Sequence, residues 1–273
     1  MNMTKPTSQL DHDQVKDSEP MSPQDLQLAL VEDCVKSNGA VLSEDTAKIR
    51  KIRRLVKSIL QGNSTYRILD IGSADGSVLY PFINDPAVTE IVAVDQNPAF
   101  LDVAKTRGFK TVCTNIDCKR LPFEDRTFDI VYAGDVIEHM VDTDWFLSEC
   151  NRMLRQDGIL ILSIPNIRTP ASIAAMIFCD YPPMGSARYR SGHFRDFTLS
   201  TAKMAVKNNG FKVVHHEGAY IYIPGFGEAF TWLASYLTSW SLQMIIEARK
   251  VSDSCYTRKN VTAGNIFDRS GSA

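Results

Sequence analysis

A carboxylate, Asp70, stands two residues before the first of two glycines in one short stretch, Arg67-Ile68-Leu69-Asp70-Ile71-Gly72-Ser73-Ala74-Asp75-Gly76-Ser77-Val78-Leu79. The apolar residues before Gly72 indicate a strand, and those after Gly76 are typical of a helix. A glycine-rich turn between a strand and a helix brings backbone N–H groups close to a ligand, and the helix N-terminus adds positive potential. The stretch therefore predicts a site for a nucleotide-type ligand, with a simple strand-to-helix turn as the alternative.

The glycine spacing argues against a dinucleotide ligand. A dinucleotide-binding turn has the pattern G-x-G-x-x-G. Counted from Gly72, its second and third glycine positions hold Ala74 and Ser77. This difference disfavours a nicotinamide-dependent oxidoreductase.

A second carboxylate, Asp95, follows the next strand pattern along the chain. In α/β folds the ligand lies across the carboxyl ends of the strands, where an acidic residue accepts hydrogen bonds from ribose hydroxyls. We expect Asp95 to take this role, with Gln96 and Asn97 beside it in the same ligand site. The alternative is that Asp95 caps the next helix, because Pro98 suits a first helical turn. The two roles are compatible.

The glycine-rich stretch resembles motif I of the class I S-adenosylmethionine (SAM)-dependent methyltransferases, usually Asp/Glu-x-Gly-x-Gly-x-Gly. Alanine takes the place of the middle glycine here. The resemblance implies that SAM is the cofactor and that it is bound by Asp70, Gly72, Ser73, Ala74 and Gly76.

Further segments resemble the same family in the same order. The run Asp117-Cys118-Lys119-Arg120-Leu121-Pro122-Phe123 is similar to the family's D-x-x-x-L-P-F segment, and Phe128-Asp129-Ile130-Val131 to its F-D-x-V strand. The resemblance implies that Asp117 accepts the adenine amino group and that the Cys118 N–H meets the adenine ring. Gly134 and Asp135 are similar to the family's loop beside the transferable methyl group.

Histidine suits a general base near pH 7, and the chain has five. The run His193-Phe194-Arg195-Asp196-Phe197-Thr198 resembles the H-x-R-x-F-T signature of a branch related to quinone-biosynthesis methyltransferases. That branch includes enzymes that methylate secondary metabolites and surface glycans. His193 is our first candidate for a base or acceptor-positioning residue, and His139 is the second. The alternatives are that His193 and Arg195 only tie a lid to the core, and that His139 is structural.

The elements that position these residues follow from hydrophobic patterning. We expect an α/β fold with a Rossmann-like, seven-stranded mixed sheet, N-terminal helices and a lid insertion between strands 5 and 6. The predicted strands lie at 67–71, 90–94, 110–114, 128–132, 159–164, 211–216 and 242–248. The predicted helices lie at 24–38, 43–60, 145–154, 171–178, 198–208 and 232–240, with Ser43 and Thr198 as caps and a further helix opening at Pro98.

The same patterning predicts the domain organisation. We expect a disordered arm at 1–22, N-terminal helices at 23–62, a SAM-binding core at 63–250 with its lid at 167–197, and a loose tail at 251–273. The predicted helix 43–60 carries many basic residues, which we interpret as a solvated face, with an anion- or membrane-binding surface as the alternative. For the apolar stretch 220–240 we favour core packing and a hydrophobic acceptor wall over a lipid contact.

Composition is typical of a globular protein: 44% of the 273 residues are hydrophobic and 23% are charged. The net charge of −2 gives no argument for a nucleic-acid partner. The six cysteines show no C-x-x-C spacing, so we predict no metal site and no disulfide framework. The first twenty residues lack an apolar segment, and no run is long enough to span a membrane. We therefore expect a cytoplasmic protein with reduced thiols.

The resemblance implies a SAM-dependent methyltransferase that acts on an oxygen or nitrogen of a small-molecule acceptor. A SAM-binding protein without catalysis, acting as a regulator or partner subunit, is the alternative from another class. The nearly complete glycine motif and the intact H-x-R-x-F-T run argue against that alternative.

Overall fold

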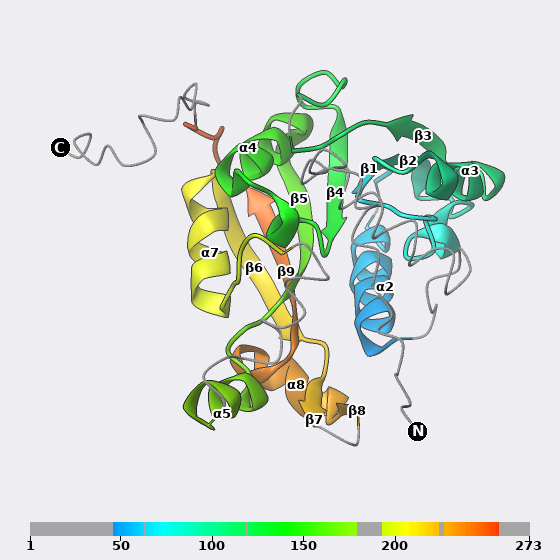
Figure 1. Ribbon diagram of the computed structural model, residues 1–273. Helices are drawn as coiled ribbons and strands as arrows, with labels where there is room; N and C mark the ends of the chain where they lie inside the picture. The colour runs from blue at the N-terminus through cyan, green and yellow to red at the C-terminus, as the bar shows by residue number, and fades with distance from the viewer. Residues whose placement is uncertain (1–45, 63, 118–119, 179–192, 224–226, 257–273) are drawn as a thin grey trace, which may run out of the picture.

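This computed structural model describes residues 46–62, 64–117, 120–178, 193–223 and 227–256. A seven-stranded sheet forms its centre, in the order β3-β2-β1-β4-β5-β9-β6 (Figure 1). Its strands are β1 (Tyr66–Ile71), β2 (Val88–Asp95), β3 (Lys110–Cys113), β4 (Phe128–Gly134), β5 (Leu154–Pro165), β6 (Phe211–Gly218) and β9 (Gln243–Lys250). The first five are parallel, and β9 runs antiparallel between β5 and β6. The expected Rossmann-like, seven-stranded mixed sheet is confirmed.

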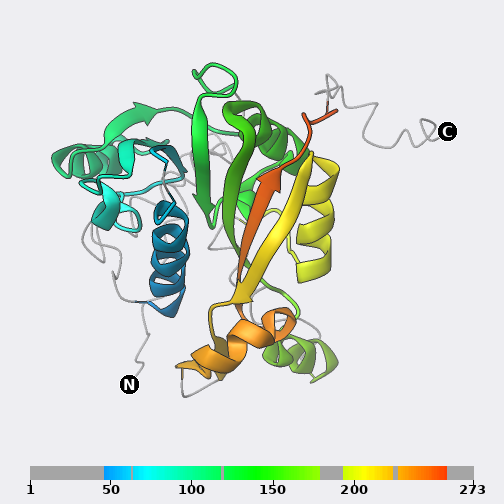
Figure 2. The ribbon, with the colours of Figure 1, turned by 180° about the vertical axis from the view of Figure 1, so that it is seen from behind.

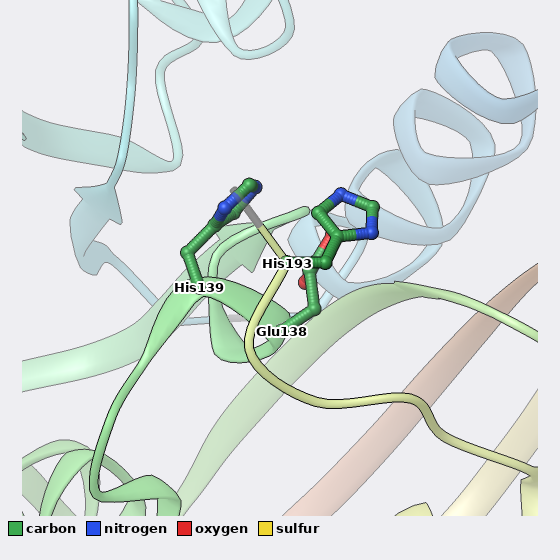
Figure 3. A group of neighbouring side chains, drawn as sticks. All are labelled: Glu138, His139 and His193. Carbon is green, nitrogen blue, oxygen red and sulfur yellow. The ribbon is translucent and has the colours of Figure 1, made fainter. Parts of the chain in front are cut away.

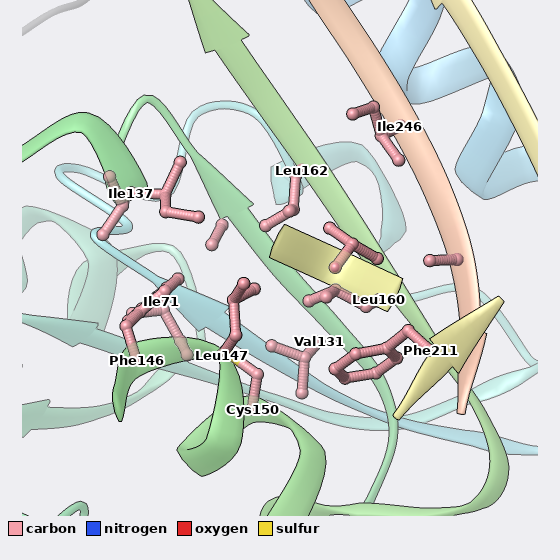
Figure 4. Packing of buried hydrophobic residues seen from close by; sticks show 14 of the residues in the cluster. Ile71, Val131, Ile137, Phe146, Leu147, Cys150, Leu160, Leu162, Phe211 and Ile246 are labelled. Atoms are coloured by element: carbon pink, nitrogen blue, oxygen red, sulfur yellow. The ribbon is translucent and has the colours of Figure 1, made fainter. Parts of the chain in front are cut away.

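Helices cover both faces of the sheet (Figures 1 and 2). On one face, α4 (Thr143–Met153) and α7 (Leu199–Asn208) bury apolar side chains against the strands, and on the other face α2 (Ala47–Leu60) and α3 (Pro98–Thr106) do so. Successive strand residues point to opposite faces, so the neighbours Ile68 and Leu69 belong to different clusters. Figure 4 shows the first cluster, in which side chains of α4 pack against Val131, Leu160 and Leu162.

A group of short elements gathers beyond the carboxyl end of the parallel strands (Figures 1 and 2). They are α5 (Pro170–Phe178), the hairpin of β7 (Ile221–Ile223) and β8 (Gly227–Ala229), α8 (Thr231–Tyr236) and the 3-10 helix η3 (Thr238–Trp240). Asn166, directly after β5, fixes this group because its Nδ2 donates to the carbonyls of Ser239 and Ser241. The predicted helix 232–240 is therefore two shorter helices, α8 and η3. The predicted lid at 167–197 forms α5 of this group, and its residues 179–192 lie outside the described residues.

Helix α2 differs from the expected solvated basic helix. It begins after Thr46, whose Oγ1 accepts a hydrogen bond from the Ile49 N–H, so the prediction that Ser43 caps it is wrong. Lys51 is buried, and its Nζ donates to the carbonyls of Gly218 and Thr231. The solvated-face interpretation therefore fails for Lys51, because this side chain joins α2 to the elements around α8.

No α-helix forms between the glycine-rich turn and β2, where residues 77–87 contain only the 3-10 helix η1 (Tyr80–Phe82). Pro81 explains this difference from the prediction, since proline lacks an N–H and its ring clashes with the carbonyl four residues earlier. The apolar residues Leu79 and Phe82 are instead buried in the second core cluster. The turn therefore lacks the positive potential of an α-helix terminus that the sequence predicted.

Two other segments differ from their predictions. β5 starts at Leu154, ahead of the predicted start at 159. Residues 155–158, which lie between the predicted helix and the predicted strand, belong to an irregular part of β5, with Asp157 at φ +62°. At the other end of the chain, Ser252 and Ser254 hydrogen-bond to Gly210 and Asn151. The beginning of the expected loose tail is therefore held to the core.

The other predicted strands and helices of the core lie where expected, including α7 with its Thr198 cap. The predicted arm at 1–22 and the predicted helix at 24–38 lie outside the described residues. Among the described helices, none is both long and apolar enough to cross a bilayer.

Candidate functional site

The loop after β1 turns sharply through three residues with positive φ: Gly72 at +66°, Ala74 at +46° and Gly76 at +74°. Gly72 has no room for a side chain, because a Cβ there would lie 2.4 Å from Cγ2 of Val136. Ala74 adopts a left-handed backbone conformation, which is lower in energy for glycine than for a residue with a Cβ atom. The loop therefore keeps the backbone course of the glycine-rich motif although one glycine is replaced.

Asp95 lies at the carboxyl end of β2 and is bound to this loop. One carboxylate oxygen accepts the Ala74 N–H at 2.9 Å, and the other accepts the Asn97 N–H at 2.9 Å. The helix that follows is capped by Asn97, whose side chain accepts the Ala99 N–H, so the alternative that Asp95 caps α3 is wrong. Each oxygen of Asp95 keeps a lone pair for a hydroxyl donor.

Asp70 is almost completely buried at the end of β1, and neither of its carboxylate oxygens has a hydrogen-bond partner among the described residues. Burial, together with the nearby charges of Asp95 and Asp75, raises the pKa of Asp70 to about 8. Asp75 is also buried and pairs with Arg107 at 3.1 Å. The loop thus lies among three acidic side chains, of which Asp70 is mostly protonated near pH 7, and two guanidinium groups, since Arg53 donates to the carbonyls of Ser77 and Val78.

This burial gives Asp70 a measurable effect on stability. Its pKa is 3.8 when exposed and about 8 in the fold, so across that range the folded chain keeps a proton that the unfolded chain releases. The contribution of Asp70 to stability therefore falls as pH rises from about 4 to 8. We expect the melting temperature of Asp70→Asn, relative to wild type, to rise steadily between pH 5 and pH 9. Parallel melting curves for the two proteins across this range would contradict the assignment, and Asp102→Asn, at an exposed position, is the control.

The remaining predicted cofactor residues lie around the same edge of the sheet. Asp117 accepts the Val141 N–H at 3.0 Å through Oδ1. Asp135 follows β4 with φ +55°, and its carboxylate pairs with Lys48 of α2, a partner that sequence reasoning missed. Gly134 is the last residue of β4, and Ser73 is buried in the loop after β1. Gln96 directly follows Asp95. Cys118 lies outside the described residues.

His139 and His193, which are far apart in the sequence, lie together (Figure 3). Their ring centroids are 4.7 Å apart, with the planes at 77°. His139 belongs to the 3-10 helix η2 (Ile137–His139), directly after β4. His193 reaches it because the N–H groups of Phe194 and Arg195 both donate to the Glu138 carbonyl, at 2.9 and 3.2 Å.

Glu138 completes this group, although sequence reasoning did not select it. Its side chain is buried, and both carboxylate oxygens lack a hydrogen-bond partner among the described residues. Burial and the charge of Asp135 raise the pKa of Glu138 to about 8. An acidic residue directly before His139, in a loop already assigned to the site, is the signal that would have identified it.

Arg195 supports the alternative of a structural tie, because its guanidinium donates to the Val141 carbonyl at 2.9 Å. The segment after His193 is therefore fastened to the turn after β4 through backbone and side chain alike. This fastening also holds the His193 imidazole close to His139, so a structural and a chemical role coexist in the same segment.

Several large apolar side chains of α5, α8 and η3 are exposed at the carboxyl end of the sheet. They are Ile173, Met176, Ile177 and Phe178 from α5, and Trp232, Tyr236 and Trp240 from the region of α8 and η3. For the last three residues the expected core packing of the stretch 220–240 is wrong, whereas the expected hydrophobic acceptor wall stays a prediction. These residues give this end of the molecule an apolar surface.

Comparisons with known proteins agree with this arrangement. Residues 69–162, which run from within β1 into β5 and include β2, β4 and η2, match the family model described as a methyltransferase domain. The ubiquinone biosynthesis O-methyltransferase of Rhodopseudomonas palustris (strain TIE-1) is 30% identical over 141 residues, which cover 50% of this chain and 53% of that protein. The chain thus spans about half the length of the curated relatives it matches.

Solved structures share the fold at lower identity. One is the 1,6-didemethyltoxoflavin-N1-methyltransferase of Burkholderia thailandensis with bound S-adenosylhomocysteine, with a TM-score of 0.57 at 17% identity over 87% of this chain and 94% of that one. Another is the cyclase SpnF, with a TM-score of 0.56 at 18% identity over 83% of this chain and 93% of that one. Since proteins named for two different reactions share this fold, the fold alone does not identify the reaction.

Proposed function

We propose that this chain is a class I SAM-dependent methyltransferase. In this proposal it transfers a methyl group from SAM to an oxygen or nitrogen of a small-molecule acceptor. The observation that carries the proposal is the loop from Gly72 to Gly76, bound to Asp95 at the adjoining strand end, within the segment that matches the family model. The similarity to O-methyltransferases of ubiquinone biosynthesis supports an oxygen acceptor.

The residues present fit SAM. The cofactor carries a positively charged sulfur, an ammonium group and two ribose hydroxyls. The buried carboxyl group of Asp70 has no hydrogen-bond partner among the described residues, so it is available to a cationic or hydrogen-bond-donating group of the ligand. Asp95 offers lone pairs to hydroxyl donors.

When bound, the cofactor supplies a methyl group on a sulfur that leaves as a neutral thioether. The protein has to hold the acceptor in line with this group and exclude water. In our proposal, Asp95 and the loop from Gly72 fix the cofactor, while His139 and His193 face the acceptor. His193 there positions the acceptor or takes the proton of its hydroxyl.

The exposed apolar surface of α5 and α8 supports an acceptor with an apolar part. A greasy acceptor that rests on Trp232, Tyr236 or Phe178 would remove this surface from water, at about 25 cal/mol for each Å² buried. The elements α5 and α8 lie beyond the carboxyl end of the parallel strands (Figure 1), and the loop after β1 and the 3-10 helix η2 after β4 follow the same ends of their strands, which supports this proposal.

Isothermal titration of the full chain with S-adenosylhomocysteine, with NAD as the control, tests the proposal. We expect micromolar or tighter binding of S-adenosylhomocysteine and no heat from NAD, because the dinucleotide glycines are absent. Binding of NAD alone, or of neither ligand, would contradict the proposal. If S-adenosylhomocysteine binds but no acceptor is methylated in a screen of hydroxyl- and amine-bearing compounds, the result supports the alternative of a non-catalytic SAM-binding protein.

A further inference from the structure

Two arginine side chains bind backbone carbonyls in the segment that carries the glycine motif. Arg53 lies on α2, and Arg107 directly follows α3. We propose that Arg53 and Arg107 are positioning residues for the cofactor: they hold the segment 72–78 in the conformation to which SAM binds. This inference rests on the proposed function, which assigns the loop to the cofactor. Neither arginine is among the cofactor residues that the sequence motifs selected.

The hydrogen bonds from Arg53 replace bonds of the missing helix. In an α-helix after the turn, the Ser77 carbonyl would accept the N–H of the residue four positions later, which is Pro81 and has no N–H. Arg53 donates to this carbonyl instead, through Nη2 at 2.7 Å, and to the Val78 carbonyl through Nε at 3.1 Å. Ser77 is buried, where a carbonyl without a partner is costly. Arg53 therefore supplies donors that a helix would have supplied.

Arg107 holds the middle of the loop through two contacts with Asp75. Its Nη1 donates to the Asp75 carbonyl at 2.9 Å and lies 3.1 Å from one carboxylate oxygen of the same residue. The other carboxylate oxygen accepts the Ser77 N–H at 3.0 Å. Asp75 is completely buried, so its charge would be costly without the guanidinium. The Tyr80 ring, whose centroid is 5.4 Å from Cζ of Arg107, helps to orient the guanidinium.

The loop needs these bonds because its backbone is strained. Ala74 has φ +46°, a conformation that is unfavourable for a residue with a Cβ atom and persists only where the surroundings hold it. Asp95 holds the Ala74 N–H, and the two guanidiniums hold carbonyls that follow it along the chain. Without the guanidiniums, a smaller fraction of the molecules has the loop in its binding conformation, and the apparent affinity falls by that fraction.

Exchange of each arginine for lysine separates the hydrogen bonds from the charge. Arg53 bonds to two successive carbonyls at once, which requires the planar fork of a guanidinium, whereas a lysine offers a compact ammonium group. Arg107 has the additional task of neutralising Asp75, and a lysine can keep this task. Lysine should therefore be a poor substitute for Arg53 and a partial substitute for Arg107.

The test is calorimetric titration of the full chain and its variants with S-adenosylhomocysteine, accompanied by urea unfolding. We expect Arg53→Ala and Arg107→Ala each to bind at least fivefold more weakly than wild type. Arg53→Lys should bind about as weakly as Arg53→Ala, whereas Arg107→Lys should bind more tightly than Arg107→Ala. The lysine variants keep the charge and most of the side chain, so they are expected to fold even where an alanine variant does not.

Arg54→Ala and Lys105→Ala are the matched controls, because each removes one positive charge from an exposed position of α2 or α3. Both should bind S-adenosylhomocysteine as wild type does. A merely structural role would lower the free energy of unfolding and leave the affinity of the folded protein unchanged. The inference is overturned if the folded variants of Arg53 and Arg107 keep wild-type affinity, or if the controls lose as much affinity as they do.

Hydrogen exchange of the proteins without ligand distinguishes failure of this inference from failure of the proposed function. The amides of residues 72–80 should exchange at least tenfold faster in Arg53→Lys than in wild type or Arg54→Ala. If wild type binds S-adenosylhomocysteine and exchange in Arg53→Lys is unchanged, the inference alone is wrong. If wild type does not bind, the proposed function fails, and with it the role of the arginines in cofactor binding.

Discussion

Replacing Gly72 with alanine is expected to lower the stability of the fold by about 2–4 kcal/mol and to weaken S-adenosylhomocysteine binding at least tenfold. Gly72 has φ +66°, a conformation that costs an L-residue roughly 1–2 kcal/mol. The added methyl group would lie 2.4 Å from Cγ2 of Val136, and such overpacking costs typically 1–3 kcal/mol. Urea unfolding and calorimetric titration measure the two effects.

Two further variants separate the causes. Gly108 also has a positive φ, +96°, but its added Cβ would come no closer than 3.4 Å to Ile83, so Gly108→Ala should show only the conformational cost. The double variant Gly72→Ala/Val136→Ala should be less destabilised than the sum of its single variants, because the clashing methyl is gone. Wild-type stability and binding in Gly72→Ala would show that the loop adapts and does not set the site.

Replacing Asp95 with alanine is expected to weaken S-adenosylhomocysteine binding by roughly 1–3 kcal/mol, the scale of hydrogen bonds lost to a charged group. The carboxylate also holds the Ala74 and Asn97 N–H groups at 2.9 Å, so its loss releases the loop at the same time. Asp95→Asn keeps one acceptor oxygen and should lie between alanine and wild type. Calorimetric titration of the three proteins gives the differences.

The control for Asp95 is Asp102→Ala, which removes the same charge from an exposed position on α3. It should bind S-adenosylhomocysteine as wild type does. If Asp95→Ala also retains wild-type affinity, Asp95 has no part in a ribose site and serves only to fasten the loop to α3. An equal loss in both aspartate variants would instead indicate a general effect of net charge.

The sequence by itself determined the sheet. A strand buried on both faces needs an almost continuous apolar run, as at 159–164, and a helix needs its apolar residues at helical spacing with a cap such as Thr198. These are local requirements, so they are visible in one segment at a time. For the same reason Asp70 and Asp95 were found, since each stands at the end of its own strand.

Predictions from local sequence patterns were wrong in two situations. In one, a single residue prevented the structure that its neighbours favoured; in the other, a side chain bonded to a residue far away in the sequence. Pro81 prevented the helix that Leu79 and Phe82 suggested. Lys51 read as one member of a basic face, yet in the fold it is buried, and its partners include the carbonyls of Gly218 and Thr231. The aromatic residues around α8 read as core, but the short elements at the carboxyl end leave them exposed.

The group of Glu138, His139 and His193 was decided by the tertiary structure alone. The sequence placed the two histidines in different segments and contained no sign that they meet, although Glu138 stands directly before His139 in a loop assigned to the site. They meet because two N–H groups after His193 bind the Glu138 carbonyl, and such a long-range hydrogen bond leaves no periodic signal in either segment. Local patterning determines which elements form, whereas the contacts between distant elements decide which side chains share a site.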